Sequence, residues 1–276
     1  MKSWRILLLV LLPLVACLTW ADPVAAVAGA AVQNDSMWID SLGALHIFGE
    51  VKNTGDVWLR FVKVTGTLRD STGAIVDVTF TYTLLSFVPP DAVAPFNMIE
   101  IDTAKSARVG SYSLLLEFQE ATALSQQLAV LNVADSKNSL GWLEVVGEVE
   151  NRGTAPSEYT QVAGAFYDVD GKVIYVHFTY TDPSEIPPGA KHPFKITLGS
   201  DERSSKIIRY AISAESENSG YTSVPETPSP TILMVAAFTV AALVLRRKRP
   251  EKINWPDFSL QNANPTPRSR VNDLGG

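Results

Sequence analysis

The sequence is poor in cysteine. Its only cysteine among 276 residues is Cys17, which lies in an apolar N-terminal run. The rest of the chain therefore has no disulfide, no thiolate metal site and no cysteine nucleophile. A fold beyond that run must be held together without cross-links between cysteines.

Positive charge is also scarce. The chain has 23 Lys and Arg against 29 Asp and Glu, which gives a formal net charge of −6, and basic residues cluster only at 246–249. Affinity for nucleic acid comes largely from clustered Lys and Arg that release counterions. We therefore expect no nucleic-acid partner.

Residues suited to catalysis are few. The three histidines, His46, His177 and His192, are not in an H-x-x-x-H spacing and do not recur between the two repeats described below. The chain lacks the motifs of a serine-hydrolase elbow, a P-loop and a dinucleotide-binding turn. We interpret the histidines as polar surface residues and expect a protein that is not an enzyme and needs no cofactor.

Residues 1–28 are typical of a secretory signal peptide. A basic start, MKSWR, precedes the apolar run ILLLVLLPLVA, and small residues follow. Cleavage after Ala21 and cleavage after Ala28 both fit this pattern. In the main interpretation Cys17 is discarded with the leader. In the alternative, the letters LVAC that end at Cys17 are a lipobox and Cys17 carries a lipid.

The C-terminal part is predicted to anchor the chain. Residues 217–230 are interpreted as a stalk of Ser, Thr and Pro, 231–245 as a transmembrane helix, and 246–276 as a basic stop (RRKR) with a disordered cytoplasmic tail. The 15 apolar residues of 231–245 are fewer than the roughly 20 that a bilayer requires. The run is apolar all round, however, which favours a span over an amphipathic surface helix. We expect a single-pass protein of the cell membrane whose domains lie outside the cytoplasm.

The tetrapeptide FTYT occurs twice, at 80–83 and again 98 positions later at 178–181. The same offset aligns residues 32–117 with residues 130–215 without a gap. The matches include Gly49 with Gly147, Asn53 with Asn151, Gly73 with Gly171, and Pro89-Pro90 with Pro187-Pro188. The chain is therefore a tandem duplication of one domain, predicted to cover 30–120 and 128–216. We call the aligned segments copy one and copy two.

Both copies show the period of β-strands. Apolar and polar residues alternate over 45–52 and over 143–150, and the turn formers DSTG (70–73) and DVDG (168–171) separate such segments. Short strands with frequent turns and no helical period predict an all-β fold with one antiparallel β-sandwich per copy. Within FTYT, the alternation predicts that Phe80 and Tyr82 point into the core, while Thr81 and Thr83 point out.

Copy two resembles the FxLYD-type domain, an immunoglobulin-like sandwich of prokaryotic surface and secreted proteins. The resemblance lies in Gly-x-Val-x-Asn (147–151), in Phe166-Tyr167-Asp168-x-x-Gly171-x-Val173, and in Pro-Pro-Gly-Ala-x-x-Pro-Phe ending at Phe194. Copy one departs from the pattern because Arg69 replaces the tyrosine. The resemblance implies two tandem immunoglobulin-like β-sandwich domains and implies no activity. The C-terminal end also resembles the anchors of archaeal surface proteins.

Three short motifs are candidate sites. Asp168 and Asp170 begin like a calcium loop, to which Asp182 and Glu185 could add oxygens, but an ordinary aspartate turn explains the same letters. Asn34 opens the glycosylation sequon Asn-Asp-Ser. The third group is the tryptophans Trp38, Trp58 and Trp142, which do not recur between copies. They suit either a binding patch or a contact between domains.

These observations favour a noncatalytic cell-surface protein. Two immunoglobulin-like domains would supply binding or structure, with a protein or a glycan as ligand, and the C-terminal helix would hold them at the membrane. The alternative is an extracytoplasmic accessory subunit of a membrane protein complex. The sequence identifies no binding residues for either hypothesis.

Overall fold

The computed structural model describes residues 27–125, 127–217 and 219–229, and in these the fold is all-β. The helical elements are one turn of α-helix, α2 (Thr103–Ser106), and one 3₁₀ turn, η1 (Ser204–Lys206). The strands are β1 (Ala30–Ile39), β2 (Leu45–Asn53), β3 (Trp58–Arg69), β4 (Ile75–Tyr82), β5 (Phe87–Val88), β6 (Val93–Glu100), β7 (Ser111–Ala121), β8 (Leu128–Lys137), β9 (Leu143–Asn151), β10 (Gln161–Tyr167), β11 (Val173–Tyr180), β12 (Lys191–Leu198), β13 (Arg209–Ser216) and β14 (Ser219–Pro228). The predicted all-β class is confirmed.

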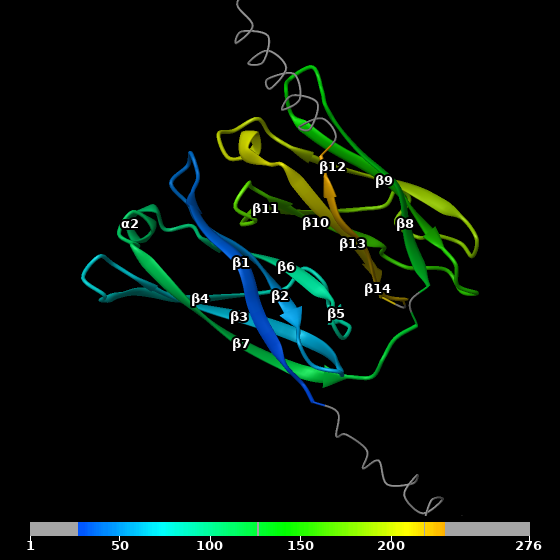
Figure 1. The fold of residues 1–276 in the computed structure, drawn as a ribbon, viewed down its shortest axis with the longest axis horizontal. Coiled ribbons are helices and arrows are strands. Elements are labelled where there is room, and N and C mark those ends of the chain that lie inside the picture. Colours follow the sequence, from blue (N-terminus) through cyan, green and yellow to red (C-terminus); the bar gives the residue numbers. More distant parts are fainter. Residues whose placement is uncertain (1–26, 126, 218, 230–276) are drawn as a thin grey trace, which may run out of the picture. The chain divides into compact units, whose positions relative to one another are not determined.

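The strands form four antiparallel sheets, two from each copy (Figure 1). Copy one contributes the sheet β1-β2-β6 and the sheet β4-β3-β5, in which β7 also pairs with β3. Copy two contributes the sheets β12-β9-β8 and β11-β10-β13-β14. In each copy a three-stranded sheet and a four-stranded sheet enclose a hydrophobic core, as in a β-sandwich.

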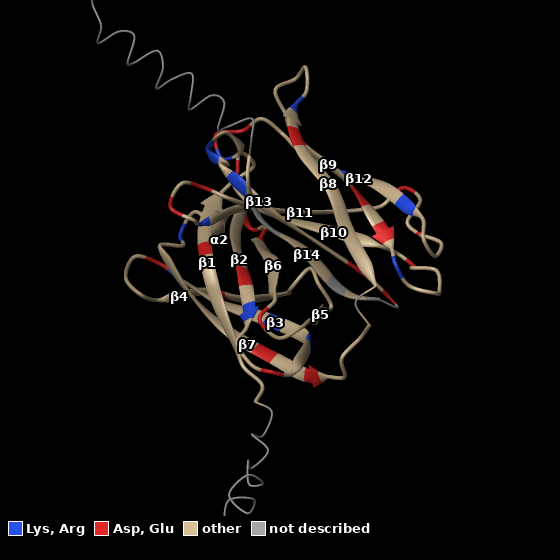
Figure 2. Ribbon diagram, turned by 45° about the vertical axis from the view of Figure 1, so that its right-hand side comes forward, with Lys and Arg blue, Asp and Glu red and all other residues tan. Residues whose placement is uncertain are grey.

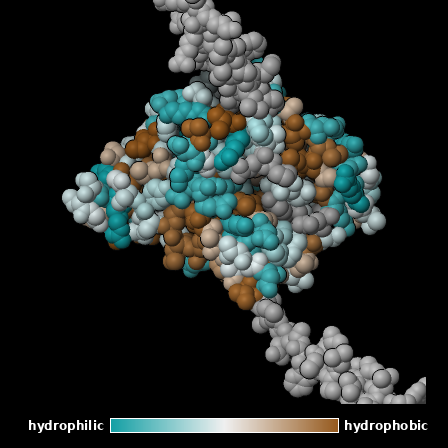
Figure 3. All heavy atoms as spheres, in the orientation of Figure 1, coloured by the Kyte–Doolittle hydropathy of each residue, from teal (hydrophilic) through white to brown (hydrophobic). Residues whose placement is uncertain are grey.

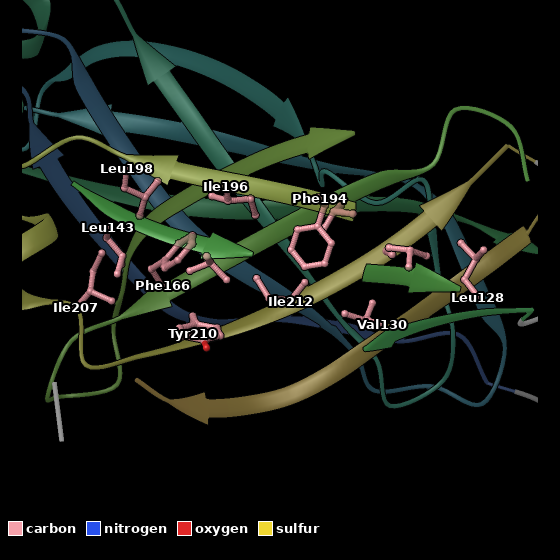
Figure 4. Packing of buried hydrophobic residues seen from close by; sticks show 14 of the residues in the cluster. Leu128, Val130, Leu143, Phe166, Phe194, Ile196, Leu198, Ile207, Tyr210 and Ile212 are labelled. Atoms are coloured by element: carbon pink, nitrogen blue, oxygen red, sulfur yellow. The ribbon is translucent and has the colours of Figure 1, made fainter. Parts of the chain in front are cut away.

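The core of copy two lies between its two sheets (Figure 4). Val145, Phe194 and Ile196 of one sheet meet Phe166 and Ile212 of the other, and all five are buried. Copy one is filled in the same way by residues at the corresponding positions of its strands, such as Ile47, Phe96, Met98, Leu68 and Leu114. The alternating residues predicted to face inward on β2 and β9 do so.

The backbone repeats the duplication in detail. Five positions adopt positive φ in each copy, and every one recurs 98 residues later. The pairs are Asn34 (56°) with Asn132 (54°), Gly43 (85°) with Gly141 (76°), Phe61 (49°) with Tyr159 (48°), Gly73 (87°) with Gly171 (79°), and Asp91 (61°) with Gly189 (73°). Positive φ is costly for residues other than glycine. Its recurrence at non-glycine positions shows that the fold, more than the local residue, sets these bends.

Buried asparagines fix the turn after the second strand of each copy. Asn53 donates through Nδ2 to the carbonyls of Val57 (2.8 Å) and Val88 (2.9 Å), and its Oδ1 accepts from the amide of Gly55 (3.0 Å). Asn151 makes the equivalent three bonds at 2.8–2.9 Å. Since buried polar groups must be paired, this side chain substitutes for backbone partners at a sharp reversal.

A tyrosine of each copy, buried at Tyr210 and partly buried at Tyr112, bonds to an aspartate on the first strand of its copy. The hydroxyl of Tyr112 donates to Asp35 at 2.5 Å, and that of Tyr210 donates to Asp135 at 3.5 Å. Burial, with the nearby carboxylate, raises the pKa of Tyr210 to about 12 and raises the pKa of Tyr112 as well. The tyrosines correspond between copies, whereas the aspartates do not, so each copy satisfies its hydroxyl from a different position.

The predicted orientation of FTYT is wrong. Phe80 and Tyr82 are 57% and 49% exposed, and Phe178 and Tyr180 are exposed to similar degrees. Thr83 is buried and donates to the carbonyl of Leu85 at 2.8 Å, and Thr181 makes the same bond to Pro183. Alternation separates the two faces of a strand, but it does not say which face is covered. Here the threonines lie on the covered face.

The predicted stalk, 217–230, also differs from the structure. Ser219–Pro228 forms β14, which pairs with β13 and is the fourth strand of the sheet β11-β10-β13-β14. Copy one has no such strand after β7 among the described residues. Serine and threonine suit an edge strand as well as a linker, so composition alone did not separate the two.

The predicted signal peptide (1–28), transmembrane helix (231–245) and tail (246–276) fall almost wholly outside the described residues. In the part of the chain that is described, no helix has the length and apolar character that a bilayer span requires.

Candidate interaction faces

The aspartates of the candidate calcium loop are engaged in a turn. Oδ1 of Asp168 accepts from the amides of Asp170 (3.0 Å) and Lys172 (2.9 Å). Asp70 makes the corresponding bonds in copy one. Asp182 follows the far end of β11, because Tyr180 pairs with Gln161 at the start of β10 whereas Asp168 follows its end. The loop and Asp182 are therefore not brought together.

Metal-ligating side chains do not gather in the described residues. No group of three or more His, Cys, Asp or Glu there is placed to hold an ion. His46 lies between Asn97 (3.2 Å) and Asp40 (3.3 Å), and His192 contacts the carbonyl of Pro183 at 2.9 Å. His177 is exposed on β11. The three histidines lie apart and form no common site.

The two modification candidates stay predictions. Cys17 lies outside the described residues. The side-chain amide of Asn34 donates to Glu50 Oε2 at 3.1 Å, and Ser36, the last residue of the sequon, donates to the carbonyl of Val173. Both residues therefore belong to the contact between the copies.

The two copies pack against each other through one face of each. The outer face of β11-β10-β13 in copy two lies on the outer face of β1-β2-β6 in copy one, and we call this the inter-repeat contact. Its apolar centre consists of Phe48 from copy one with Ala165, Tyr167, Val173 and Val176 from copy two. As a result, β2 and β10 are buried on both faces, whereas their counterparts β9 and β3 are buried on one.

A buried tyrosine and a buried glutamate join the copies at this contact. The hydroxyl of Tyr167 donates to Glu50 Oε1, and Asn34 and Gln33 donate to Oε2 of the same carboxylate. Glu50 is 3% exposed and Tyr167 is 1% exposed. A buried carboxylate is tolerated only with such donors, so this bond ties the register of one copy to the other.

Arg203 lies across the contact on aromatic rings. Its guanidinium carbon is 4.1 Å from the ring centre of Tyr175, 4.8 Å from that of Phe48 and 5.8 Å from that of Trp38. Its Nε and Nη1 are buried and have no hydrogen-bond partner among the described residues. Cation–π attraction compensates part of that cost. Of the three candidate tryptophans, Trp38 thus serves the contact between copies, while Trp142 is exposed beside a turn.

Glu215 of copy two binds backbone amides of copy one. Its carboxylate accepts from the amide of Ser86 at 2.7 and 2.9 Å and from that of Phe87 at 3.4 Å. Burial raises the pKa of Glu215, although the same hydrogen bonds act in the opposite direction. The nearby amide of Gln161 donates to the carbonyl of Leu84 at 2.7 Å.

An exposed apolar surface covers the outer face of β4-β3-β7 in copy one, and we call it the front face. It includes Val78, Phe80, Tyr82 and Leu115, each about half exposed or more. Phe80 and Tyr82 meet edge to face, with ring centres 6.0 Å apart, and the ammonium of Lys63 lies 4.8 Å from the centre of the Phe80 ring. Figure 3 shows that hydrophobic patches lie among hydrophilic ones on the face of the molecule in view. Large exposed apolar patches of soluble proteins mark interaction sites.

The front face is not dominated by one sign of charge. Acidic and basic residues are interspersed along the strands of the described residues (Figure 2). On the front face Lys63 pairs with Glu117 at 2.9 Å. Sequence reasoning missed this surface because it placed Phe80 and Tyr82 in the core, yet the repetition of FTYT was a correct signal that the tetrapeptide has a common structural environment.

No protein-family model matches the chain, and no curated protein matches it. Among solved structures, a red sea bream transglutaminase is similar at 12% identity and a TM-score of 0.24, over 71% of this chain and 31% of that one. An exo-chitosanase of Amycolatopsis orientalis is similar at 10% identity and a TM-score of 0.25, over 70% of this chain and 26% of that one. The chain thus spans about a third or less of each of these proteins.

Proposed function

We propose that the chain is a noncatalytic cell-surface protein in which two immunoglobulin-like domains, joined by the inter-repeat contact, are held at the membrane by a helix at 231–245. Its role is to bind another molecule or to build the cell envelope. The leader at 1–28 and the basic stop that begins at Arg246 support export and a cytoplasmic C-terminus.

The observation that carries the proposal is the front face. The front face exposes the apolar side chains of Val78, Phe80, Tyr82 and Leu115 to water, which is unfavourable. Such a sheet surface suits a macromolecular partner better than a small substrate. The described polar clusters support the same conclusion, because they serve turns, buried asparagines and the contact between copies.

The inter-repeat contact adds rigidity. The Tyr167–Glu50 bond and the amides that bind Glu215 fix one sandwich on the other, so the chain presents its surfaces as one body. Preorganised surfaces lose less entropy on binding than surfaces on flexibly linked domains.

The proposal is tested with the full chain carrying an epitope tag after Gly276, expressed in a prokaryotic host. The tagged protein should sediment with membranes and resist extraction at alkaline pH. External protease on intact spheroplasts should remove an epitope inserted in the exposed turn at Gly73 and leave the C-terminal tag protected. The proposal fails if the protein is in the soluble fraction or if both tags are protected.

The same membranes test the accessory-subunit hypothesis. Affinity capture of the detergent-solubilised chain should recover no other membrane protein in fixed ratio. A stoichiometric membrane partner would favour the accessory subunit over the independent surface protein.

A further inference from the structure

The inter-repeat contact joins two different faces, one from each copy. Because the chain is a duplication, each copy carries both kinds of face. The contact uses the β1-β2-β6 face of copy one and the β11-β10-β13 face of copy two. It leaves the front face of copy one and the outer face of β12-β9-β8 in copy two, which we call the back face. These two free faces correspond to the two halves of the contact.

The exposed residues on the free faces occupy the positions that the contact buries. Val176 at the contact is 5% exposed, and its counterpart Val78 on the front face is 55% exposed. Phe48 at the contact is 1% exposed, and its counterpart Val146 on the back face is 39% exposed. Each free face thus has an exposed valine at a position that the contact buries, while Thr67 and Arg69 of the front face take the places of Ala165 and Tyr167.

The central polar bond of the contact has a charged counterpart on the free faces. Arg69 on the front face corresponds to Tyr167, and Glu148 on the back face corresponds to Glu50. Asn132 donates to Glu148 Oε2 at 2.7 Å, as Asn34 does to Glu50 at 3.1 Å, so the two carboxylates are held alike. The guanidinium of Arg69, in the place of the Tyr167 hydroxyl, would donate to the carboxylate of Glu148. The two groups carry opposite charges, which strengthens such a hydrogen bond.

A second pair at the rim is also complementary. Where Gln161 donates to the carbonyl of Leu84 at 2.7 Å, the front face has Lys63 and the back face has Asp182. Asp182 lines a hollow of about 600 Å³ on the back face together with Val146, Glu148 and Lys195. The ammonium of Lys195 lies 3.9 Å from Oε1 of Glu144, which leaves Asp182 and Glu148 as the carboxylates of the hollow that face Lys63 and Arg69.

We propose that the front face of one molecule binds the back face of another, in the arrangement that copy two adopts on copy one. The partner is a second copy of this chain. The inference rests on the proposed function in that it names the partner of a binding or structural protein, but the contact itself needs only the two-sandwich body. Since the faces differ, each added molecule leaves one front face and one back face free, and association continues beyond the dimer.

The test uses the full chain in detergent, at a detergent ratio that gives one molecule per micelle at the lowest protein concentration. Sedimentation velocity then measures the size of the species as the protein concentration is raised. The wild-type chain should form dimers and then larger species. Arg69→Glu places a carboxylate against Glu148 and should weaken association more than tenfold, and Glu148→Arg should do the same by opposing two cations. Val78→Asp should also abolish it, because it puts a charge at the apolar centre.

Mixing the two charge variants provides the sharper measurement. In the mixture, Arg69 of the Glu148→Arg chain meets Glu148 of the Arg69→Glu chain, and the reversed residues form the swapped pair. Association should return to near the wild-type strength although each variant alone associates more than tenfold more weakly. Lys172→Glu and Asp170→Lys, which reverse exposed charges in the turn between β10 and β11, are matched controls and should associate like the wild type.

A monomeric wild-type chain at the highest concentration would overturn the inference, and so would association that neither charge variant weakens or that mixing does not restore. Circular dichroism of each variant guards against misfolding. Membrane fractionation of the same samples reports the anchor separately, so loss of self-association and failure of the surface-protein proposal give different results.

Discussion

The hydroxyl of Tyr167 in copy two donates to Oε1 of Glu50 in copy one, and both side chains are almost fully buried. This bond crosses 117 positions of sequence and links the two copies at the centre of their contact. The tyrosine belongs to the sequence Phe166-Tyr167-Asp168 at the end of β10. In copy one the same position is Arg69, which donates to the carbonyl of Gly73 at 3.2 Å.

Replacing Tyr167 by Phe should lower the free energy of unfolding by about 1–3 kcal/mol, because the buried Glu50 carboxylate loses a donor while the ring volume is kept. Denaturant unfolding of the full-length protein measures the change. Tyr180→Phe, at a half-exposed tyrosine of the same strand hairpin, is the control and should change stability by less than about 0.5 kcal/mol. Equal effects of the two substitutions would contradict the buried bond.

Glu215 should make the stability of the protein fall as pH rises. Burial raises the pKa of Glu215, so the folded state favours the protonated carboxyl. The resulting contribution to the free energy of unfolding is complete below the usual glutamate pKa of about 4.3. It is lost as pH rises through the raised pKa. Glu215→Gln removes the titration and keeps an acceptor for the amide of Ser86. The difference in unfolding free energy, wild type minus variant, should therefore decrease with pH above about 4.

Glu117→Gln is the matched control, since it removes the carboxylate at the corresponding exposed position of copy one. Parallel pH profiles for wild type and Glu215→Gln would show that Glu215 titrates normally.

Truncation of two phenylalanines tests the orientation of FTYT. Phe96 is fully buried, and Phe96→Ala should cost about 3–5 kcal/mol through lost burial and the cavity left behind. Phe80→Ala should cost about 1 kcal/mol or less, since Phe80 is exposed and loses mainly its contacts with Lys63 and Tyr82. If thermal unfolding shows that Phe80→Ala loses as much stability as Phe96→Ala, Phe80 lies in the core and its outward orientation is wrong.

The matched bend at Asp91 and Gly189 predicts opposite effects of exchanging the residues. Asp91 has φ 61° and Gly189 has φ 73°. Asp91→Gly should raise stability by up to about 1 kcal/mol, and Gly189→Asp should lower it by about 1–2 kcal/mol, because a Cβ is strained in this region. Melting temperatures of the two variants check the sign, and shifts in the same direction would contradict it.

Much of the fold followed from the sequence. The 98-residue offset predicted two equivalent all-β units, and alternation identified the inward residues of β2 and β9. The Asp and Gly residues of DSTG and DVDG predicted the turns at Asp70 and Asp168. These features depend on local period and turn chemistry, which a sequence displays directly.

The contact between copies did not follow, although a signal was present. The outward positions of β10 are Ala163, Ala165 and Tyr167, whereas the corresponding positions of β3 are Thr65, Thr67 and Arg69. The more apolar set is the one that the other copy covers. A comparison of outward residues between the repeats indicates this face, whereas the inward residues are apolar in both copies and do not distinguish them.

β14 has a practical consequence for anyone who prepares a shortened protein. The duplication ends near Ser216, but a fragment cut there would strip the strand that pairs with β13 and would lose the bond from Ser229 to Asp135 at 2.6 Å. Copy one already ends in β7, which pairs only with β3 among the described strands, and such a fragment would leave β13 as a sheet edge in the same way. Unpaired margins recruit strands from other molecules. A soluble version of the body should therefore extend through Ser229.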